Sequence, residues 1–468
     1  AMLSAVVNIR SVSNDNIPNV IIPASLLSEG NLELSEFDHA ANDPPTLKRY
    51  WLVQTDGGVY ARYPIWTGVV ATPIFAPFIL FGDGLPSEAL LLRIGRLAAL
   101  VFCGLFGGVL AVTLRRFMSG SRAVLLTILT LHGTTLWHCL GSQLTNQTLP
   151  ILCLALILFL LTGTDMTRRR ALASGLLAGL AVAARLPVLF MAAAPLGLFL
   201  SRPKWRRYIP IVAAAALVFP LLTLFYNQSV FGGFFTTGYS AETNDRFDAP
   251  FWEGLAGLIF SPTCGLLIYS PFLLLAVIKP APIRAVTERE RSSPKHDDLA
   301  RWLLLGILGQ WLLFAKWWSW NGGLIYGGSR MLVETIPALV LLIGIHGSQS
   351  TDAILIRSSA AGLNPLSRRK LSRLLPALGV FSVALFLVGT VAYDAIAPTN
   401  PTKPTWDITR DFIALYLREF GLVSLITETL KQGALLLGTF LAGGYLVSRF
   451  LDPADASTEP KTQPGCHA

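Results

Sequence analysis

Residues 92–114, LRIGRLAALVFCGLFGGVLAVTL, form a largely apolar stretch, and Arg115 and Arg116 follow it directly. A transmembrane helix needs about 20 predominantly apolar residues, so this stretch is long enough to cross a bilayer. Similar apolar runs recur along most of the chain. The sequence therefore predicts an all-α protein, a polytopic transmembrane helical bundle.

Composition agrees with a membrane protein. The chain is 53% hydrophobic and only 14% charged, with a mean hydropathy of +0.55, whereas soluble domains carry about 25% charged residues. We expect about 11–12 spans. The apolar runs fall at 65–81, 92–114, 123–139, 148–164, 171–184, 187–200, 208–226, 262–278, 301–316, 331–346, 374–395 and 433–449.

The charged residues and cysteines argue against several other classes. Lys and Arg exceed Asp and Glu by 37 to 28, but no basic patch is interleaved with aromatics on a soluble module, so nucleic acid is not the expected partner. The five cysteines show no CxxC or Cys/His ligand spacing. We expect no disulfide framework, no zinc site and no cofactor, and the sequence leaves any other metal requirement open.

Basic clusters predict the orientation, because Lys and Arg concentrate in cytoplasmic loops. The clusters lie at 115–122, 168–170, 202–207, 279–295 and 368–373. Residues 92–450 are then a transmembrane domain, with outer loops at 140–147, 227–261, 317–330 and 396–432. Residues 451–468 are predicted to be a disordered cytoplasmic tail.

Residues 1–91 are predicted to be a first extracytoplasmic loop with interfacial helices. The run at 65–81 carries Pro73 and Pro77, so we interpret it as an interfacial or re-entrant helix rather than a span. That interpretation places the start of the chain outside with no span before it. We therefore expect a first transmembrane helix, ending near Asn8, that is missing from this sequence.

Ser13–Pro64 is the longest polar run near the front of this apolar chain. It combines Asp15 and Asp56 with Arg62 and several aromatic residues. Carboxylates and cations beside membrane spans suggest a site for an anionic, membrane-associated substrate. Farther along, Arg185-Leu186-Pro187 interrupts the apolar segment 171–200, and an ionisable residue in such a segment is often functional.

A series of short motifs is spread along nearly the whole chain. They are Ser13-Asn14-Asp15-Asn16-Ile17-Pro18, Pro23-Ala24-Ser25-Leu26-Leu27, Asp56-Gly57, Arg62-Tyr63-Pro64, Ser142-Gln143, Gln147, Pro150, Ala184-Arg185-Leu186-Pro187, Phe260-Ser261-Pro262, Tyr269-Ser270-Pro271, Trp318, Trp320, Gly323, Tyr326-Gly327 and Arg330.

In these motifs the chain resembles integral-membrane glycosyltransferases of the GT-C superfamily. Within it, the chain is similar to the protein mannosyltransferase and aminoarabinose transferase group. The resemblance implies that Asp15 is the catalytic carboxylate and that Arg62 binds the donor phosphate. Arg330 and Tyr326 are further candidates for binding that phosphate. Tyr63, Asp56, Arg185, Gln143 and Gln147 are further candidate site residues. The loop 141–147 lacks the acid that some relatives carry there.

Each candidate also has a plain structural interpretation. Asp15 suits a turn or N-cap before the helix that starts at Pro18. Arg62 and Arg330 could anchor the membrane interface, and Arg185 could extend to it. Asp56-Gly57 is most simply a hairpin turn.

The predicted function is transfer of a sugar from a polyprenyl-phosphate donor to an acceptor on the extracytoplasmic face of a bacterial inner membrane. The partners implied are the lipid-linked sugar, the bilayer and an acceptor that the sequence does not identify. Two alternatives remain. One is a transporter or flippase for a lipid-linked sugar, and the other is a non-catalytic subunit of a membrane assembly with a degenerate transferase fold.

Overall fold

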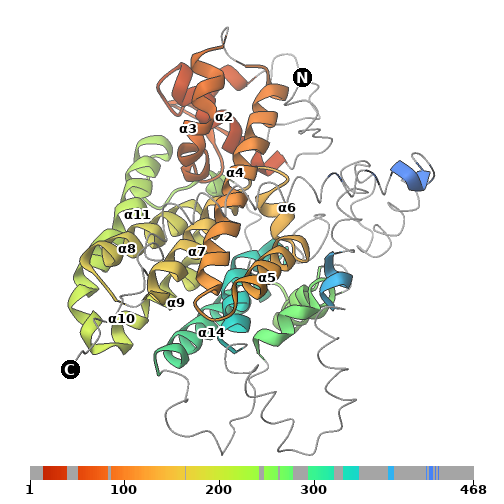
Figure 1. Cartoon of the computed structure of the whole chain (residues 1–468). Helices are drawn as coiled ribbons and strands as arrows, with labels where there is room; N and C mark the ends of the chain where they lie inside the picture. The colour runs from red at the N-terminus through yellow and green to blue at the C-terminus, as the bar shows by residue number, and fades with distance from the viewer. Residues whose placement is uncertain are drawn as a thin grey trace, which may run out of the picture.

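Figure 1 shows the computed structural model of the chain. It describes residues 14–38, 51–82, 86–163, 165–241, 247–261, 264–277, 294–320, 330–346 and 378–383, together with residues 418, 421–424, 427 and 431.

The described part is almost entirely helical. Its α-helices are α2 Pro18–Ser28, α3 Trp66–Leu80, α4 Glu88–Leu114, α5 Gly120–His132, α6 Leu136–Leu140, α7 Thr148–Thr162, α8 Arg168–Ala184, α9 Leu189–Leu196, α10 Leu198–Ser201, α11 Ile209–Phe231, α12 Phe251–Phe260, α13 Leu266–Tyr269 and α14 Pro294–Ala315. Residues 336–346 form a further helical stretch.

Short 3-10 helices and one hairpin complete the described elements. The 3-10 helices are η1 Asn14–Asn16, η2 Ser35–Phe37, η3 Leu186–Val188, η4 Pro203–Tyr208, η5 Gly238–Ala241, η6 Pro271–Ala276 and η8 Arg330–Thr335. The hairpin pairs β1 Leu52–Thr55 with β2 Gly58–Ala61 in antiparallel register.

Three helical stretches among the described residues are long and apolar enough to cross a membrane. They are Glu88–Leu114, Pro203–Phe231 and Asp297–Ala315. The first is 83% buried inside the protein and the second only 11%, so α4 is an inner helix and α11 presents its apolar surface outward. The prediction of a helical membrane protein is confirmed, and the total of 11–12 spans stays a prediction.

The N-terminal elements form a unit at one end of the molecule, seen in red and orange at the top of Figure 1. Helices α2 and α3 pack against each other and against the start of α4. Pro18 occupies the first turn of α2, where the missing N–H costs nothing. Trp66 of α3 donates its indole N–H to Thr223 of α11 over 2.7 Å. This bond ties the N-terminal unit to the bundle.

The helical stretch 336–346 is buried throughout its length. Helix α8 packs between α7 and α11, and α14 packs against α9 and α12. Thr167 caps the start of α8 by accepting a hydrogen bond from the Arg170 N–H over 3.3 Å. Helix α11 is followed by Gly232, whose φ of +74° is a left-handed conformation that suits glycine.

Two predicted apolar runs are not single helices. The run 123–139 is interrupted after α5, because Thr134 donates its hydroxyl to the Thr130 carbonyl over 2.6 Å and accepts from the Leu136 N–H over 3.2 Å. These side-chain bonds compete with the helical ladder. The run 262–278 is divided into α13 and η6 at Pro271, which has no N–H to donate.

The predicted interruption of segment 171–200 is confirmed. Helix α8 ends at Ala184, and Arg185 adopts an extended conformation before η3. The predicted tail 451–468 lies outside the described residues. So do residues 279–293 and 347–373, which we expect to be cytoplasmic, and most of the predicted loop 396–432. The division of the chain into domains therefore stays a prediction.

Candidate functional site

Asp15 lies in η1, immediately before α2, and its two carboxylate oxygens meet different partners. The Tyr63 hydroxyl donates a hydrogen bond to Oδ1 over 3.1 Å. The Arg330 guanidinium lies 3.6 Å from Oδ2. The Asp15 side chain is 26% exposed and that of Arg330 20%. The carboxylate therefore has a phenol on one side and a cation on the other, and it remains open to solvent.

The hairpin brings Tyr63 to this carboxylate, and Arg62 precedes Tyr63 in the chain. The register pairs Leu52 with Ala61, and the Arg62 N–H continues the ladder by donating to the Trp51 carbonyl over 2.9 Å. Residues 62–63 therefore leave the end of β2 in a defined position. Arg62 is only 8% exposed, although it is a cation.

Glu33 holds the hairpin against the chain after α2. Its carboxylate accepts hydrogen bonds from the Val59 N–H over 2.7 Å and from the Ser35 hydroxyl over 2.7 Å. Partial burial raises the pKa of Glu33, but hydrogen bonds from Ser35, Val59 and Leu34 outweigh burial and hold that pKa below its ordinary value of 4.5. The ionised carboxylate is therefore the form that fastens the hairpin.

Tyr239 of η5, in the predicted outer loop 227–261, covers Arg62 and Tyr63. The Arg62 guanidinium carbon lies 5.9 Å from the centre of the Tyr239 ring, a cation–π distance. The rings of Tyr63 and Tyr239 meet edge to face at 5.4 Å. Gly238 permits this approach, since a Cβ there would lie 2.6 Å from the Arg62 Cα.

Arg330 joins the site from the start of η8. Besides Asp15, it acts electrostatically on His138 of α6. Partly exposed ion pairs contribute about 0.2–1 kcal/mol, and 3.6 Å is a loose contact. Arg330 can therefore turn from Asp15 to an anionic ligand at little cost.

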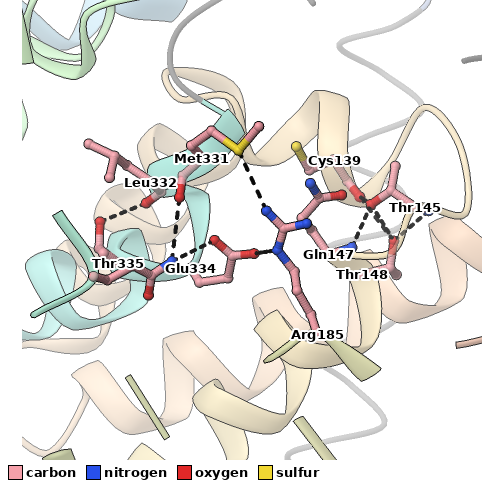
Figure 2. Close-up of polar contacts among 10 residues, drawn as sticks. Cys139, Thr145, Gln147, Thr148, Arg185, Met331, Leu332, Glu334 and Thr335 are labelled. Carbon is pink, nitrogen blue, oxygen red and sulfur yellow. Dashed lines mark hydrogen bonds and ion pairs between the residues drawn. The ribbon is translucent and has the colours of Figure 1, made fainter. Parts of the chain in front are cut away.

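A second polar cluster lies along the same 3-10 helix (Figure 2). Arg185 Nε lies 2.6 Å from Oε1 of Glu334, whose side chain is fully buried. Gln310 of α14 donates to the other Glu334 oxygen over 2.9 Å. Arg185 also reaches the Met331 sulfur at 3.7 Å. Arg185 is thus half of a buried ion pair rather than an arginine that extends to the membrane interface.

The loop 141–147 is held by hydrogen bonds to its own ends. The hydroxyls of Thr145 and Thr148 both donate to the Cys139 carbonyl, over 2.7 and 2.9 Å, and the Gln147 N–H donates to Thr145, as Figure 2 shows. Gln143 and Gln147 are buried, at 8% and 6% exposed.

Asn19 of α2 docks on the same loop. It donates to the Leu144 carbonyl over 3.2 Å and to the Asn146 side chain over 3.0 Å. The loop therefore positions η1 and Asp15, which precede α2.

Asp56 lies away from the site. Asp56 is exposed in the turn at the far end of the hairpin from Arg62. The Thr55 hydroxyl donates to the Gly58 carbonyl across that turn over 3.1 Å, so the hairpin interpretation of Asp56-Gly57 is confirmed. Tyr326 lies outside the described residues.

The structure adds residues that the sequence reasoning missed. Tyr239 lies in a polar loop with no motif to mark it. Glu334 did carry a signal, because it is an acid within the apolar run 331–346. Gln310 interrupts the apolar pattern of α14 in a similar way. Within the described ranges, no group of three or more His, Cys, Asp or Glu residues is arranged to hold a metal ion.

The fold and the site together define a helical membrane protein with a carboxylate and cations gathered where the N-terminal unit meets η5 and η8. No family model and no curated protein matches the chain.

Among solved structures, two crystal structures of ArnT from Cupriavidus metallidurans are similar to it. The apo structure has 17% identity and a TM-score of 0.46, over 94% of this chain and 73% of ArnT. The structure bound to undecaprenyl phosphate has 17% identity and a TM-score of 0.44, over 96% and 75%. At such low similarity, the activity of this chain rests on its own side chains.

Proposed function

We propose that this chain is a membrane glycosyltransferase that moves a sugar from a polyprenyl-phosphate donor to an acceptor on the extracytoplasmic face. The observation that carries the proposal is the placement of Asp15. Its carboxylate is held between the Tyr63 hydroxyl and the Arg330 guanidinium, and Arg62 is the chain neighbour of Tyr63.

The proposed reaction needs one base and a cationic environment for the leaving group. An acceptor hydroxyl attacks the anomeric carbon, and its proton passes to the Asp15 carboxylate. A new glycosidic bond forms as the bond between that carbon and the phosphate oxygen breaks, and the electron pair stays on the phosphate. The configuration at the anomeric carbon inverts in a single displacement of this kind.

The two arginines suit the leaving group. A guanidinium binds phosphate oxygens through two parallel N–H bonds. Arg62 is 8% exposed, and the Tyr239 ring lies against its guanidinium, so its charge acts in an environment of reduced dielectric constant. Arg330 is loosely paired with Asp15 and is free to contact a phosphate that arrives beside the base.

The experiment uses the purified full chain in nanodiscs with undecaprenyl-phosphate-linked sugars, since undecaprenyl phosphate is the lipid in one of the ArnT structures. Asp15→Asn should reduce transfer about 10²–10⁴-fold, as expected for loss of a general base, while the lipid still binds. Arg62→Ala should weaken binding of undecaprenyl phosphate about 10- to 100-fold, because a charge-assisted hydrogen bond is lost.

Asp56→Asn is the matched control, since Asp56 is an exposed acid in the hairpin that precedes Arg62. It should leave both transfer and binding unchanged. Undiminished transfer by Asp15→Asn would remove Asp15 as the base.

A transporter is the second candidate, favoured by the interrupted helix after Ala184 and its buried ion pair. A transporter would move the lipid-linked sugar across the membrane of a vesicle, and even the wild type would form no glycosidic bond.

A further inference from the structure

The Arg185–Glu334 pair is a deeply buried charge pair. Glu334 has no exposed side-chain surface and Arg185 is 17% exposed. Arg185 stands at the interruption between α8 and η3, where its φ of −160° and ψ of 102° lie outside the helical region. The interruption therefore points the guanidinium toward η8 instead of along the helix.

Two side chains from outside η8, those of Arg185 and Gln310, attach to it. Arg185 contacts Glu334 and the Met331 sulfur. Gln310 of α14 donates to Glu334 over 2.9 Å and to the Met331 carbonyl over 3.4 Å. Figure 2 shows Arg185 and Glu334 facing each other beside Met331. The contacts connect α8 and α14 to one short 3-10 helix.

Arg330, the first residue of η8, precedes Met331 directly and faces Asp15. A 3-10 helix has weaker hydrogen-bond geometry than an α-helix, so η8 relies on outside contacts for its exact position. We propose that Arg185, Glu334 and Gln310 are positioning residues that hold η8 so that Arg330 faces Asp15. The kinetic consequence rests on the proposed function, whereas the consequence for the conformation of η8 does not.

A buried ion pair of this kind adds little to the stability of a fold. Removing water from two charges offsets most of their attraction, and apolar residues of similar volume often replace a buried pair with no loss of stability. A guanidinium and a carboxylate do, however, require a specific mutual geometry. Replacement by apolar residues should therefore preserve the fold and loosen the position of η8.

The test compares the double variant Arg185→Met/Glu334→Leu with the wild type in nanodiscs. We expect a wild-type melting temperature, hydrogen exchange of amides 330–335 at least about tenfold faster, and unchanged exchange in 336–346. With a lipid-linked sugar donor, KM should rise about tenfold or more, since Arg330 is displaced from the phosphate. Wild-type exchange at 330–335, or equal acceleration in both segments, would overturn the proposal.

Two further variants cover other outcomes. Glu334→Gln keeps a hydrogen-bonding group while removing the charge, so the same exchange criterion applies if the double variant does not fold. Arg116→Met removes an arginine that bonds the Phe159 carbonyl and the Thr162 hydroxyl in the last turn of α7. It should leave exchange at 330–335 and KM unchanged. If the wild type shows no transfer, the proposed function fails. The exchange measurement still tests whether Arg185, Glu334 and Gln310 hold η8 in place.

Discussion

Gly175 is the position where one added methyl group should measurably weaken the bundle. It lies on the face of α8 that packs against α11. A Cβ at this position would lie 2.5 Å from the Val212 carbonyl oxygen and 2.8 Å from the Ala215 Cβ. Ordinary contacts lie at 3.4–4 Å, so the new atom would be roughly 1 Å too close. Both obstacles belong to the backbone or to a Cβ, and neither can rotate away.

Helices α8 and α11 must therefore separate in Gly175→Ala. Overpacking of this kind costs about 1–3 kcal/mol, and close approach through small residues is a main source of helix association in membranes. We expect the melting temperature of the purified protein in detergent to fall by about 2–5 °C. Gly120→Ala is the matched control, because a Cβ there meets nothing nearer than the Arg115 Nε at 3.9 Å.

Gly179 offers a second check of the same reasoning. It lies one turn further along α8, and a Cβ there would lie 2.9 Å from the Ala216 carbonyl carbon. One separation of α8 from α11 accommodates both added methyl groups, so the double variant Gly175→Ala/Gly179→Ala should cost less than the sum of the single variants. A Gly175→Ala protein that melts like Gly120→Ala would refute the close packing of α8 on α11.

Three further predictions concern the site, the hairpin and the topology. Tyr63→Phe removes the hydrogen bond to Asp15, so transfer should fall about tenfold; an unchanged initial rate would contradict the role of that bond. Because hydrogen bonds hold the pKa of Glu33 below 4.5, its stabilising effect is present at neutral pH and lost as the pH falls below that value. Glu33→Gln should therefore lower the melting temperature more at pH 7 than at pH 3, and an equal loss at both would exclude the carboxylate as the cause. A membrane-impermeant thiol reagent added outside should modify Asp248→Cys and not Asp297→Cys, and the reverse pattern would show the orientation to be wrong.

Sequence reasoning succeeded where structure depends on neighbouring residues. The stretch 92–114 forms nearly all of α4, because length and hydropathy are local properties. Asp56-Gly57 forms the expected turn, since turn chemistry involves only a few adjacent residues. The interruption at Arg185 could be predicted because Pro187 lies two residues later.

Sequence reasoning missed the side-chain bonds that interrupt the run 123–139. Thr134 bonds to Thr130 and Leu136, and the apolar pattern of that run continues on both sides of the interruption. A hydropathy pattern records burial and not hydrogen bonding, so such a break follows only from the folded geometry.

The chain by itself determined a helical membrane protein and marked Asp15, Arg62, Arg185 and Arg330 as candidates. Only the tertiary structure decided which of them meet. Arg330 reaches Asp15, whereas Arg185 turns to Glu334. Contacts between residues so far apart in the chain depend on how the helices pack, and the pattern along each helix leaves that packing open. The same physical reason placed Tyr239 over Arg62, from a loop whose sequence carried no sign of it.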